Sequence, residues 1–246
     1  MHCAACLAVR AFNSSQAVRF LAFETATRHL SVALWQDGEI TERYADHPNS
    51  GSAYLLPWAH ELLALSGITL QQLDGIAFGA GPGGFTGLRL ACGVAQGLAF
   101  GLDVPVAPIS TLAALALASG ERHVWTCLDA RMNEIYAAAY TIEGDVAHEV
   151  MAPHCVAPAV SPAPTFQDAW GVGDGFKTYT DLLTSRKPDL AGIHPDAFPS
   201  ATAVARLAAP VLASGRGVAA ADAQPIYVRE KVAFTTSERL ARGGLK

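Results

Sequence analysis

The chain has 246 residues, enough for one large domain or two small ones. Hydrophobic residues make up 51% of it and charged residues only 16%, so the chain is too apolar to be disordered. The net charge of −5 and the pI near 5.9 argue against a protein that binds nucleic acid by itself, because neutralising phosphates needs a surplus of Lys and Arg. So low a charged fraction also predicts that a partner covers part of the surface.

Five cysteines are scattered along the chain, an odd number that is not typical of a secreted domain held by disulfides. We therefore expect a reducing compartment, the cytoplasm. The Cys3-Ala-Ala-Cys6 spacing is that of a metal or redox pair, but no second pair follows, and we interpret it as coincidence in a flexible N-terminal extension over residues 1–18. No stretch of about 18 residues is apolar without interruption, so we expect no membrane span.

The first half of the chain alternates strands and helices. Apolar runs rich in β-branched or aromatic residues predict strands over residues 19–26, 29–38 and 39–46, and Asp37-Gly38 is a strong hairpin signal. The sequence then predicts, in order, a helix, a strand, a helix and a strand over residues 53–67, 74–80, 88–101 and 104–109. The resulting order β-β-β-α-β-α-β indicates an α/β layer structure.

The pattern then starts again. An offset of 105 residues aligns the two segments without a gap and superposes three pairs of residues: Asp129 on Glu24, Ile135 on Leu30 and Tyr140 on Trp35. We infer that one unit is duplicated, with chance similarity of two hairpins as the alternative. The first lobe is expected over residues 19–110, and a second, smaller and degenerate lobe over residues 111–246. Two such lobes predict a two-lobed actin-like, RNase H-like α/β fold.

Three glycines between a predicted strand and a predicted helix satisfy the G-x-G-x-x-G pattern of a dinucleotide site: Gly79, Gly81 and Gly84. The next strand ends in Ser110, with no carboxylate for a ribose hydroxyl, and the motif follows the fourth strand instead of the first. No GK[ST] follows it. We therefore expect neither a dinucleotide site nor a P-loop.

A longer string around these glycines is more specific. Gly81-Pro82-Gly83-Gly84-Phe85-Thr86-Gly87-Leu88-Arg89 resembles the GPGSFTG-Leu/Val-Arg signature of the TsaB family (formerly YeaZ), with Gly84 in place of the usual Ser. The resemblance extends over nearly all of residues 19–234, and it includes LAFETATRHLSVALW, STLAALA, LDARMNEIYAAAY and QPIYVREKVA. Residues 1–18 have no counterpart in that family.

The resemblance implies the fold of the actin-like ATPase superfamily, in which the first hairpin normally wraps phosphates and a carboxylate at its head holds magnesium through water. Here the turn Thr25-Ala26-Thr27-Arg28-His29 has no glycine and two bulky side chains, which disfavours the closure of backbone N–H groups on phosphate oxygens. We interpret Glu24, Thr25 and Asp129 as vestiges of a cofactor site or as strand-end hydrogen-bonding groups. No cofactor of the chain's own is expected, and ATP or ADP at a junction with another subunit stays open.

The eight histidines give no zinc motif. None lies three or four positions from another, whereas a catalytic zinc site on a helix needs such a pair and a third ligand. The resemblance implies that the catalytic relative, TsaD, carries the histidine motif that this chain lacks. We expect no metal site and no catalytic residue in this chain.

Two predicted helices of the first lobe have more small and apolar residues than one sheet face can cover. Glycine costs about 1 kcal/mol per interior helix position relative to alanine, so a row of glycines four residues apart predicts the close approach of another helix. The residues expected at an interface are Tyr54, Leu55, Trp58, Leu62, Arg89, Gly93, Gly97 and Gly101. Burial of both helices within one lobe is the alternative.

The resemblance implies a non-catalytic subunit that binds TsaD. The complex transfers a threonylcarbamoyl group to N6 of adenosine 37 of tRNA, giving t6A, with the help of the small ATPase TsaE. The same helices are expected to form a homodimer when TsaD is absent, and tRNA is expected to bind only to the complex. An autonomous actin-fold ATPase or kinase is the alternative function.

Overall fold

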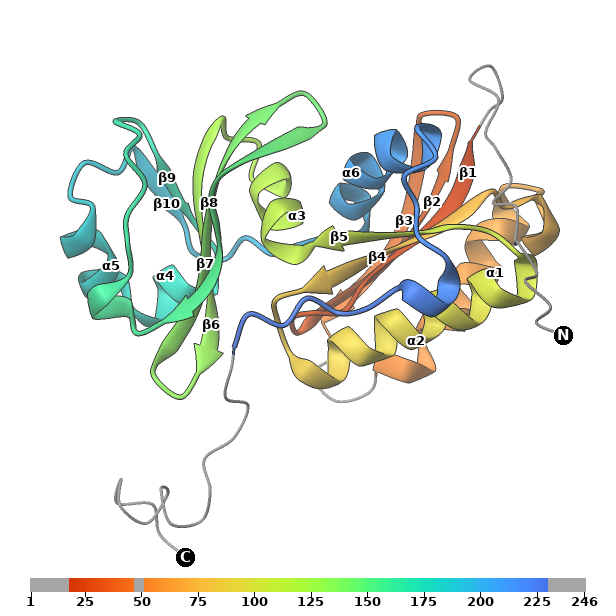
Figure 1. The fold of residues 1–246 in the computed structure, drawn as a ribbon, viewed down its shortest axis with the longest axis horizontal. Coiled ribbons are helices and arrows are strands. Elements are labelled where there is room, and N and C mark those ends of the chain that lie inside the picture. The colour runs from red at the N-terminus through yellow and green to blue at the C-terminus, as the bar shows by residue number, and fades with distance from the viewer. Residues whose placement is uncertain (1–17, 47–50, 230–246) are drawn as a thin grey trace, which may run out of the picture.

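The computed structural model describes residues 18–46 and 51–229, and its ribbon forms two lobes side by side (Figure 1). Each lobe contains a five-stranded sheet, with strand orders β3-β2-β1-β4-β5 and β10-β9-β6-β7-β8. The first sheet comprises β1 (Arg19–Glu24), β2 (His29–Gln36), β3 (Glu39–Asp46), β4 (Gly75–Gly81) and β5 (Val106–Ser110). The second comprises β6 (His123–Arg131), β7 (Glu134–Glu143), β8 (Val146–Val156), β9 (Trp170–Val172) and β10 (Gly192–His194). The helices are α1 (Leu55–Leu65), α2 (Phe85–Leu102), α3 (Thr111–Ala118), α4 (Asp174–Thr178), α5 (Thr180–Arg186) and α6 (Ala201–Ala213).

The two sheets have the same topology. In the first, β1 pairs antiparallel with β2 and parallel with β4; in the second, β6 pairs antiparallel with β7 and parallel with β9. Strands β6, β7, β8, β9 and β10 therefore correspond to β1, β2, β3, β4 and β5. This correspondence confirms the predicted two-lobed α/β fold and its duplicated unit.

The pairing corrects the alignment of the two copies by one residue. Phe20 pairs with Trp35 in the first hairpin, whereas Trp125, the counterpart of Phe20, pairs with Ala139 and not with the predicted Tyr140. The offset of 105 holds for β6 and falls to 104 in β7. The cause is a shorter turn in the second hairpin, because consecutive residues at positive φ reverse the chain there.

Alternation along the strands of the first sheet gives it two apolar faces. Leu21 and Phe23 point to the side covered by α1 and α2, while Phe20 and Ala22 point to the side covered by α6. All four side chains are fully buried. The hairpin signal is confirmed, since Asp37 and Gly38 both have positive φ at the β2–β3 turn.

Helix α6 corrects the predicted boundary between the lobes. The predicted boundary places it in the second lobe, with residues 111–246, but it packs on β1, β2, β4 and β5 of the first sheet. Its alanine-rich inner face includes the fully buried Ala201, Ala205 and Ala208, which allow close contact with the small side chains of Ala22 and Ala77. The second lobe thus ends before residue 201. Of the predicted extension 1–18, only Val18 belongs to the described residues.

Helix α3 lies between the lobes (Figure 1), in contact with α6 and with β6, β7 and β8. Helices α4 and α5 cover the other side of the second sheet, where Phe176 meets the edge of the buried Trp125 ring. Within the described residues, α2 is the one helix long and apolar enough to cross a membrane by length and composition. Its packing on β4 accounts for part of that composition, but only 28% of the helix is buried.

Candidate functional site

Glu24 ends β1 in a fully buried position. Its Oε1 atom accepts a hydrogen bond from the Ala26 backbone N–H at 2.7 Å, and its Oε2 atom accepts one from the Thr111 hydroxyl at 3.4 Å. Burial raises the pKa of this carboxyl from 4.5 to about 7. A Cβ atom on Gly79 would lie 1.9 Å from Oε2, so the glycine provides the space for the carboxyl group.

The string Gly81 to Arg89 closes on the β1–β2 turn. Gly84 N–H donates to the Ala26 carbonyl at 2.7 Å, and the Thr25 hydroxyl donates to the Gly87 carbonyl at 2.6 Å. A Cβ atom on Gly87 would lie 1.9 Å from the Thr25 carbonyl oxygen, and one on Gly83 would lie 2.7 Å from Ala26. The glycines therefore provide close contact with the turn. Since the Ala26 N–H is bound to Glu24, this N–H of the turn is not available to a phosphate group.

Asp129 occupies the equivalent place in the second lobe. Its Oδ1 atom accepts a hydrogen bond from Arg131 N–H at 2.8 Å, the same two-residue bond that Glu24 makes with Ala26. Its Oδ2 atom pairs with the Arg131 guanidinium at 3.1 Å. The backbone N–H of Asp129 donates a hydrogen bond to Asp174 Oδ1 at 2.9 Å. Burial raises the pKa of Asp174. Glu24 and Asp129 thus each accept a hydrogen bond from a backbone N–H of the hairpin turn that follows them.

The described residues contain no group of three or more His, Cys, Asp and Glu side chains placed to hold a metal ion. Several histidines there pair singly with a carboxylate: His29 with Asp46 at 2.8 Å, and His123 with Asp168 at 2.6 Å. Such pairs supply too few ligands for a closed zinc site.

The predicted glycine row faces outward. Gly93, Gly97 and Gly101 are exposed, and a Cβ atom on any of them would meet none of the described residues within 4 Å. The adjoining row, Ala91, Ala95 and Ala99, is buried against the sheet. The alternative in which the glycines pack inside the lobe is therefore wrong.

The structure divides the other predicted interface residues into two groups. Leu55 and Leu62 are fully buried between α1 and the sheet, so their assignment to an interface is wrong: they belong to the core. Tyr54 and Trp58 are partly buried, with their rings 5.2 Å apart. Arg89 is exposed, and its guanidinium stacks 3.8 Å above the Phe85 ring.

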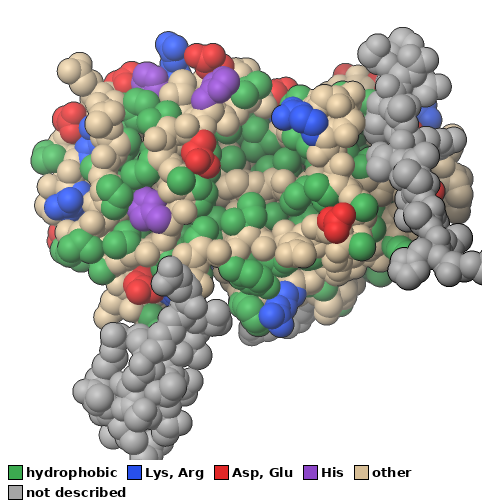
Figure 2. All heavy atoms as spheres, in the orientation of Figure 1, with side chains coloured by type: hydrophobic (Ala, Val, Ile, Leu, Met, Phe, Trp, Pro, Cys, Tyr) green, Lys and Arg blue, Asp and Glu red, His purple; other side chains and the backbone are tan. Residues whose placement is uncertain are grey.

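Four large apolar side chains that sequence reasoning did not assign to the interface are exposed on α1 and α2: Leu56, Leu65, Phe85 and Phe100. Phe100 is the most exposed, at 83%. Because α1 is apolar nearly all round, its hydrophobic pattern alone could not show which side faces out. On the face that Figure 2 shows, charged and histidine side chains are sparser over the visible part of the first lobe, on the right, than over the second. We call the outward side of α1 and α2 the docking face.

Comparisons with known proteins identify the family. A family model described as "TsaD: tRNA N6-adenosine threonylcarbamoyltransferase" matches residues 50–237. The chain is 33% identical to the tRNA threonylcarbamoyladenosine biosynthesis protein TsaB of Escherichia coli and 35% identical to that of Haemophilus influenzae, with 88% and 89% of this chain and 97% of each relative covered. The chain belongs to the TsaB family.

A solved structure supports the same assignment. YeaZ from Pseudomonas aeruginosa superposes with a TM-score of 0.80 at 35% identity, over 85% of this chain and 99% of that one. The resemblance predicted from the glycine string is thereby confirmed, and with it the place of the TsaB family in the actin-like ATPase superfamily. In this member of the family, the signature string joins the first hairpin to the start of α2.

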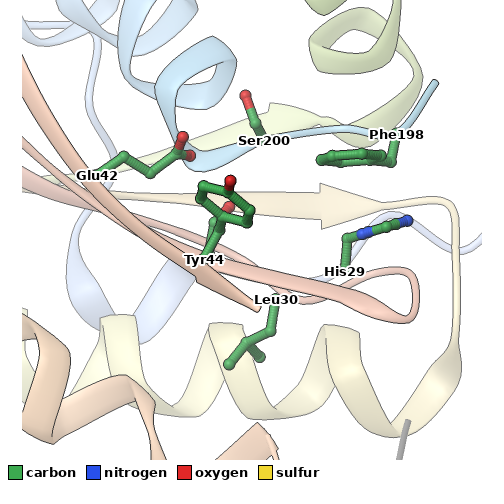
Figure 3. Close-up of a pocket in the computed structure, with 7 residues that line it drawn as sticks. His29, Leu30, Glu42, Tyr44, Phe198 and Ser200 are labelled. Carbon is green, nitrogen blue, oxygen red and sulfur yellow. The ribbon is translucent and has the colours of Figure 1, made fainter. Parts of the chain in front are cut away.

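A small pocket lies between strands β2 and β3 of the first sheet and the residues just before α6 (Figure 3). It is lined by His29, Leu30, Ser31, Glu42, Tyr44, Phe198 and Ser200. The His29 ring stacks on Phe198 with 3.6 Å between the ring centres, and its Nδ1 atom faces Asp46. Burial lowers the pKa of His29.

The polar groups of this pocket hold the first turn of α6. Ser31 Oγ accepts from Ala201 N–H at 2.7 Å, and Glu42 Oε1 accepts from Thr202 N–H at 3.0 Å. Ser200 is the N-cap residue of the helix. These backbone donors would otherwise lack partners at a helix start. The pocket is therefore the point at which α6 is attached to the first sheet.

Proposed function

We propose that this chain is a non-catalytic subunit of the machinery that makes N6-threonylcarbamoyladenosine in tRNA, and that it binds the catalytic subunit TsaD through the docking face. Family membership supports the pathway, since the two relatives described above are named for it. The reaction would take place on TsaD, and this chain would support it by association.

One observation carries the proposal: the outward row of Gly93, Gly97 and Gly101 on α2. Exposed glycines inside a helix lower its stability by about 1 kcal/mol each relative to alanine, and no contact among residues 18–46 and 51–229 compensates for that loss. A partner helix lying close against the row would compensate for it. The exposed Phe100 and Leu65 add apolar area, of the kind that marks a protein interface and not free surface.

Gly97→Leu tests the proposal. The new side chain would hold a facing helix away, and overpacking of about 1 to 3 kcal/mol corresponds to a loss of affinity for TsaD of about 5- to 150-fold. The isolated chain should keep its melting temperature or gain slightly, because leucine is the better helix former and its Cβ atom would meet no described residue within 4 Å. Binding by calorimetry or ultracentrifugation, beside a thermal melt, measures both.

Ser185→Leu is the matched control, because it adds the same group to an exposed site on α5 in the second lobe. It should leave binding unchanged. Equal affinity for TsaD in the Gly97→Leu variant would contradict the proposal. We propose that the chain forms a homodimer through the docking face when TsaD is absent. Gly97→Leu should weaken that homodimer as well.

The remaining parts of the proposal concern TsaE, tRNA and nucleotide. We propose that TsaE and tRNA meet this chain only within the complex, and that ATP or ADP binds, if at all, at the junction with TsaD. The isolated chain should show no ATPase, peptidase or tRNA-modifying activity. Titration of ATP into the isolated chain tests the alternative, an autonomous ATPase or kinase, and turnover abolished by Glu24→Ala or Asp129→Ala would favour that alternative.

A further inference from the structure

The end of the described chain returns along the first lobe. Val218 and Val106 exchange two backbone hydrogen bonds of 2.8 Å. Farther on, the Ala223 carbonyl accepts bonds from the Gln96 side chain at 2.9 Å and from the Cys92 thiol at 3.4 Å, both on α2. Residues 224–229 then cross to the second lobe, as the blue segment in Figure 1 shows. We call residues 224–229 the strap.

The middle of the strap is attached where β4 ends and α2 begins. Ile226 N–H donates to the Ala80 carbonyl at 2.7 Å. The Tyr227 ring lies 6.0 Å from the Phe85 ring, and the Arg89 guanidinium donates to the Tyr227 hydroxyl at 3.3 Å. The strap therefore contacts the first two turns of α2, the helix that provides most of the docking face.

The last described residue of the strap, Arg229, is bound to the second lobe. The two N–H bonds of its Nη2 atom are shared among three acceptors: the Ala130 carbonyl at 2.9 Å, the Arg131 carbonyl at 3.3 Å and Glu134 Oε2 at 2.6 Å. Only 14% of its side chain is exposed. A guanidinium can serve several acceptors in fixed directions, and charge-assisted bonds of this kind are stronger than neutral ones.

The acceptors of Arg229 surround a strained turn. Arg131, Met132 and Asn133 follow one another at φ of 61°, 58° and 61°. Residues with a side chain disfavour this region, although asparagine tolerates it, and several in succession persist only where the surroundings hold them. Asp129 bonds one N–H of the turn, and Arg229 bonds the carbonyls at its start.

We propose that the strap fixes the second lobe to the start of α2, with Arg229 as the positioning residue at its far end. The β6–β7 turn and the first turn of α2 are then two ends of one connected unit, although 46 positions separate Phe85 from Arg131 in the sequence. As an extension that rests on the proposed function, binding of TsaD to the docking face stabilises the turn in the second lobe. By reciprocity, loosening of the strap lowers the affinity for TsaD.

Hydrogen exchange on the full chain tests the strap without any partner. In Arg229→Ala, the bonded amides of Arg131 and Ile226 should both exchange about tenfold faster or more, because each opens with the loss of charge-assisted bonds. Arg229→Lys should restore part of the protection. Arg216→Ala is the matched control: its guanidinium bonds Ser214 and lies in the same terminal segment, so it should change neither site.

Faster exchange confined to Arg131, with Ile226 unchanged, would overturn the proposal, since Arg229 would then act within the second lobe only. Unchanged exchange at both sites would overturn it as well. Should Arg229→Ala fail to fold, Glu134→Gln removes the charged acceptor and keeps the guanidinium, and it should increase exchange at the same two sites by a smaller factor.

Affinity for TsaD separates this inference from the proposed function. Arg229→Ala should weaken binding about three- to tenfold although Arg229 lies outside the docking face. Binding equal to that of the unmodified chain, with Gly97→Leu still defective, would overturn the coupling and leave the proposed function intact. Absence of any binding by the unmodified chain would overturn the proposed function, while the exchange result would still decide the strap.

Discussion

The two lobes hold equivalent hairpin turns by different means. In the first, Glu24 is completely buried, the turn from Thr25 to Arg28 has no positive φ, and glycines of the signature string lie against it. In the second, Asp129 pairs with Arg131, and residues 131–133 all have positive φ. Both carboxylates nonetheless make the same bond to the N–H two residues on.

This difference shows how a duplicated unit keeps one structural element while its surroundings diverge. The first turn is held by shape, because glycines let two backbone segments touch. The second is held by charge, since the guanidinium of Arg229 and the carboxylate of Asp129 bond its backbone. The first turn should therefore be sensitive to added atoms, and the second to removed charge.

An alanine at Gly87 should have the largest effect on stability. Its Cβ atom would lie 1.9 Å from the Thr25 carbonyl oxygen, which is backbone and cannot rotate away. We expect the free energy of unfolding to fall by about 3 to 4 kcal/mol in denaturant titration. Gly97→Ala, with open space around the new atom, should instead gain up to about 1 kcal/mol. Equal stability of the two variants would show that Gly87 is not in close contact with the β1–β2 turn.

Glu24 should give the first lobe a pH dependence of stability. The unfolded chain ionises this carboxyl near pH 4.5, whereas the folded chain keeps the proton until about pH 7. The folded state thus binds more protons between these values, so the free energy of unfolding falls by about 3 kcal/mol as pH rises through that window. The contribution is fully present below pH 4.5 and lost above pH 7.

Glu24→Gln should remove this pH dependence, because the amide keeps an acceptor for Ala26 N–H and never ionises. At pH 8 the variant should be more stable than the unmodified chain by about 1 to 3 kcal/mol, measured by urea titration at several pH values. Parallel pH curves for the two proteins would contradict the buried, protonated state of Glu24.

Local patterns in the sequence were sufficient for the strands of the first sheet, the Asp37-Gly38 hairpin and the duplicated unit, because these depend on alternation and on turn residues. The outward direction of the glycine row also followed from a local rule. Glycine lowers the stability of a helix, so a row of glycines predicts close contact with another helix. The assignment of Leu55 and Leu62 to an interface failed because α1 is apolar on more than one side. Which side meets the sheet depends on neighbours far away in the sequence.

Long-range contacts account for the other differences. Helix α6 joins the first sheet through Ser31, Glu42 and a row of alanines, and no local signal assigns a helix to one sheet over another. The role of Arg229 depends on a contact 99 positions away, with the Ala130 carbonyl. An isolated arginine in a closing segment indicates nothing by itself, so the strap could not be predicted.

The smallest effect is expected at Gly84, where the usual Ser of the family signature is missing. Gly84 is the N-cap residue of α2, and no side chain caps the helix there. A serine hydroxyl could accept from the N–H of Thr86 or Gly87, but its Cβ atom would lie 3.2 Å from the Ala26 carbonyl oxygen. Gly84→Ser should thus change the free energy of unfolding by less than about 0.5 kcal/mol. Gly84→Ala makes the same contact without the hydroxyl, so it should be the less stable of the two in parallel denaturant titrations. If Gly84→Ala were the more stable variant, the N–H groups at the start of α2 would gain nothing from a side-chain cap. The serine of the family would then serve another purpose at this position.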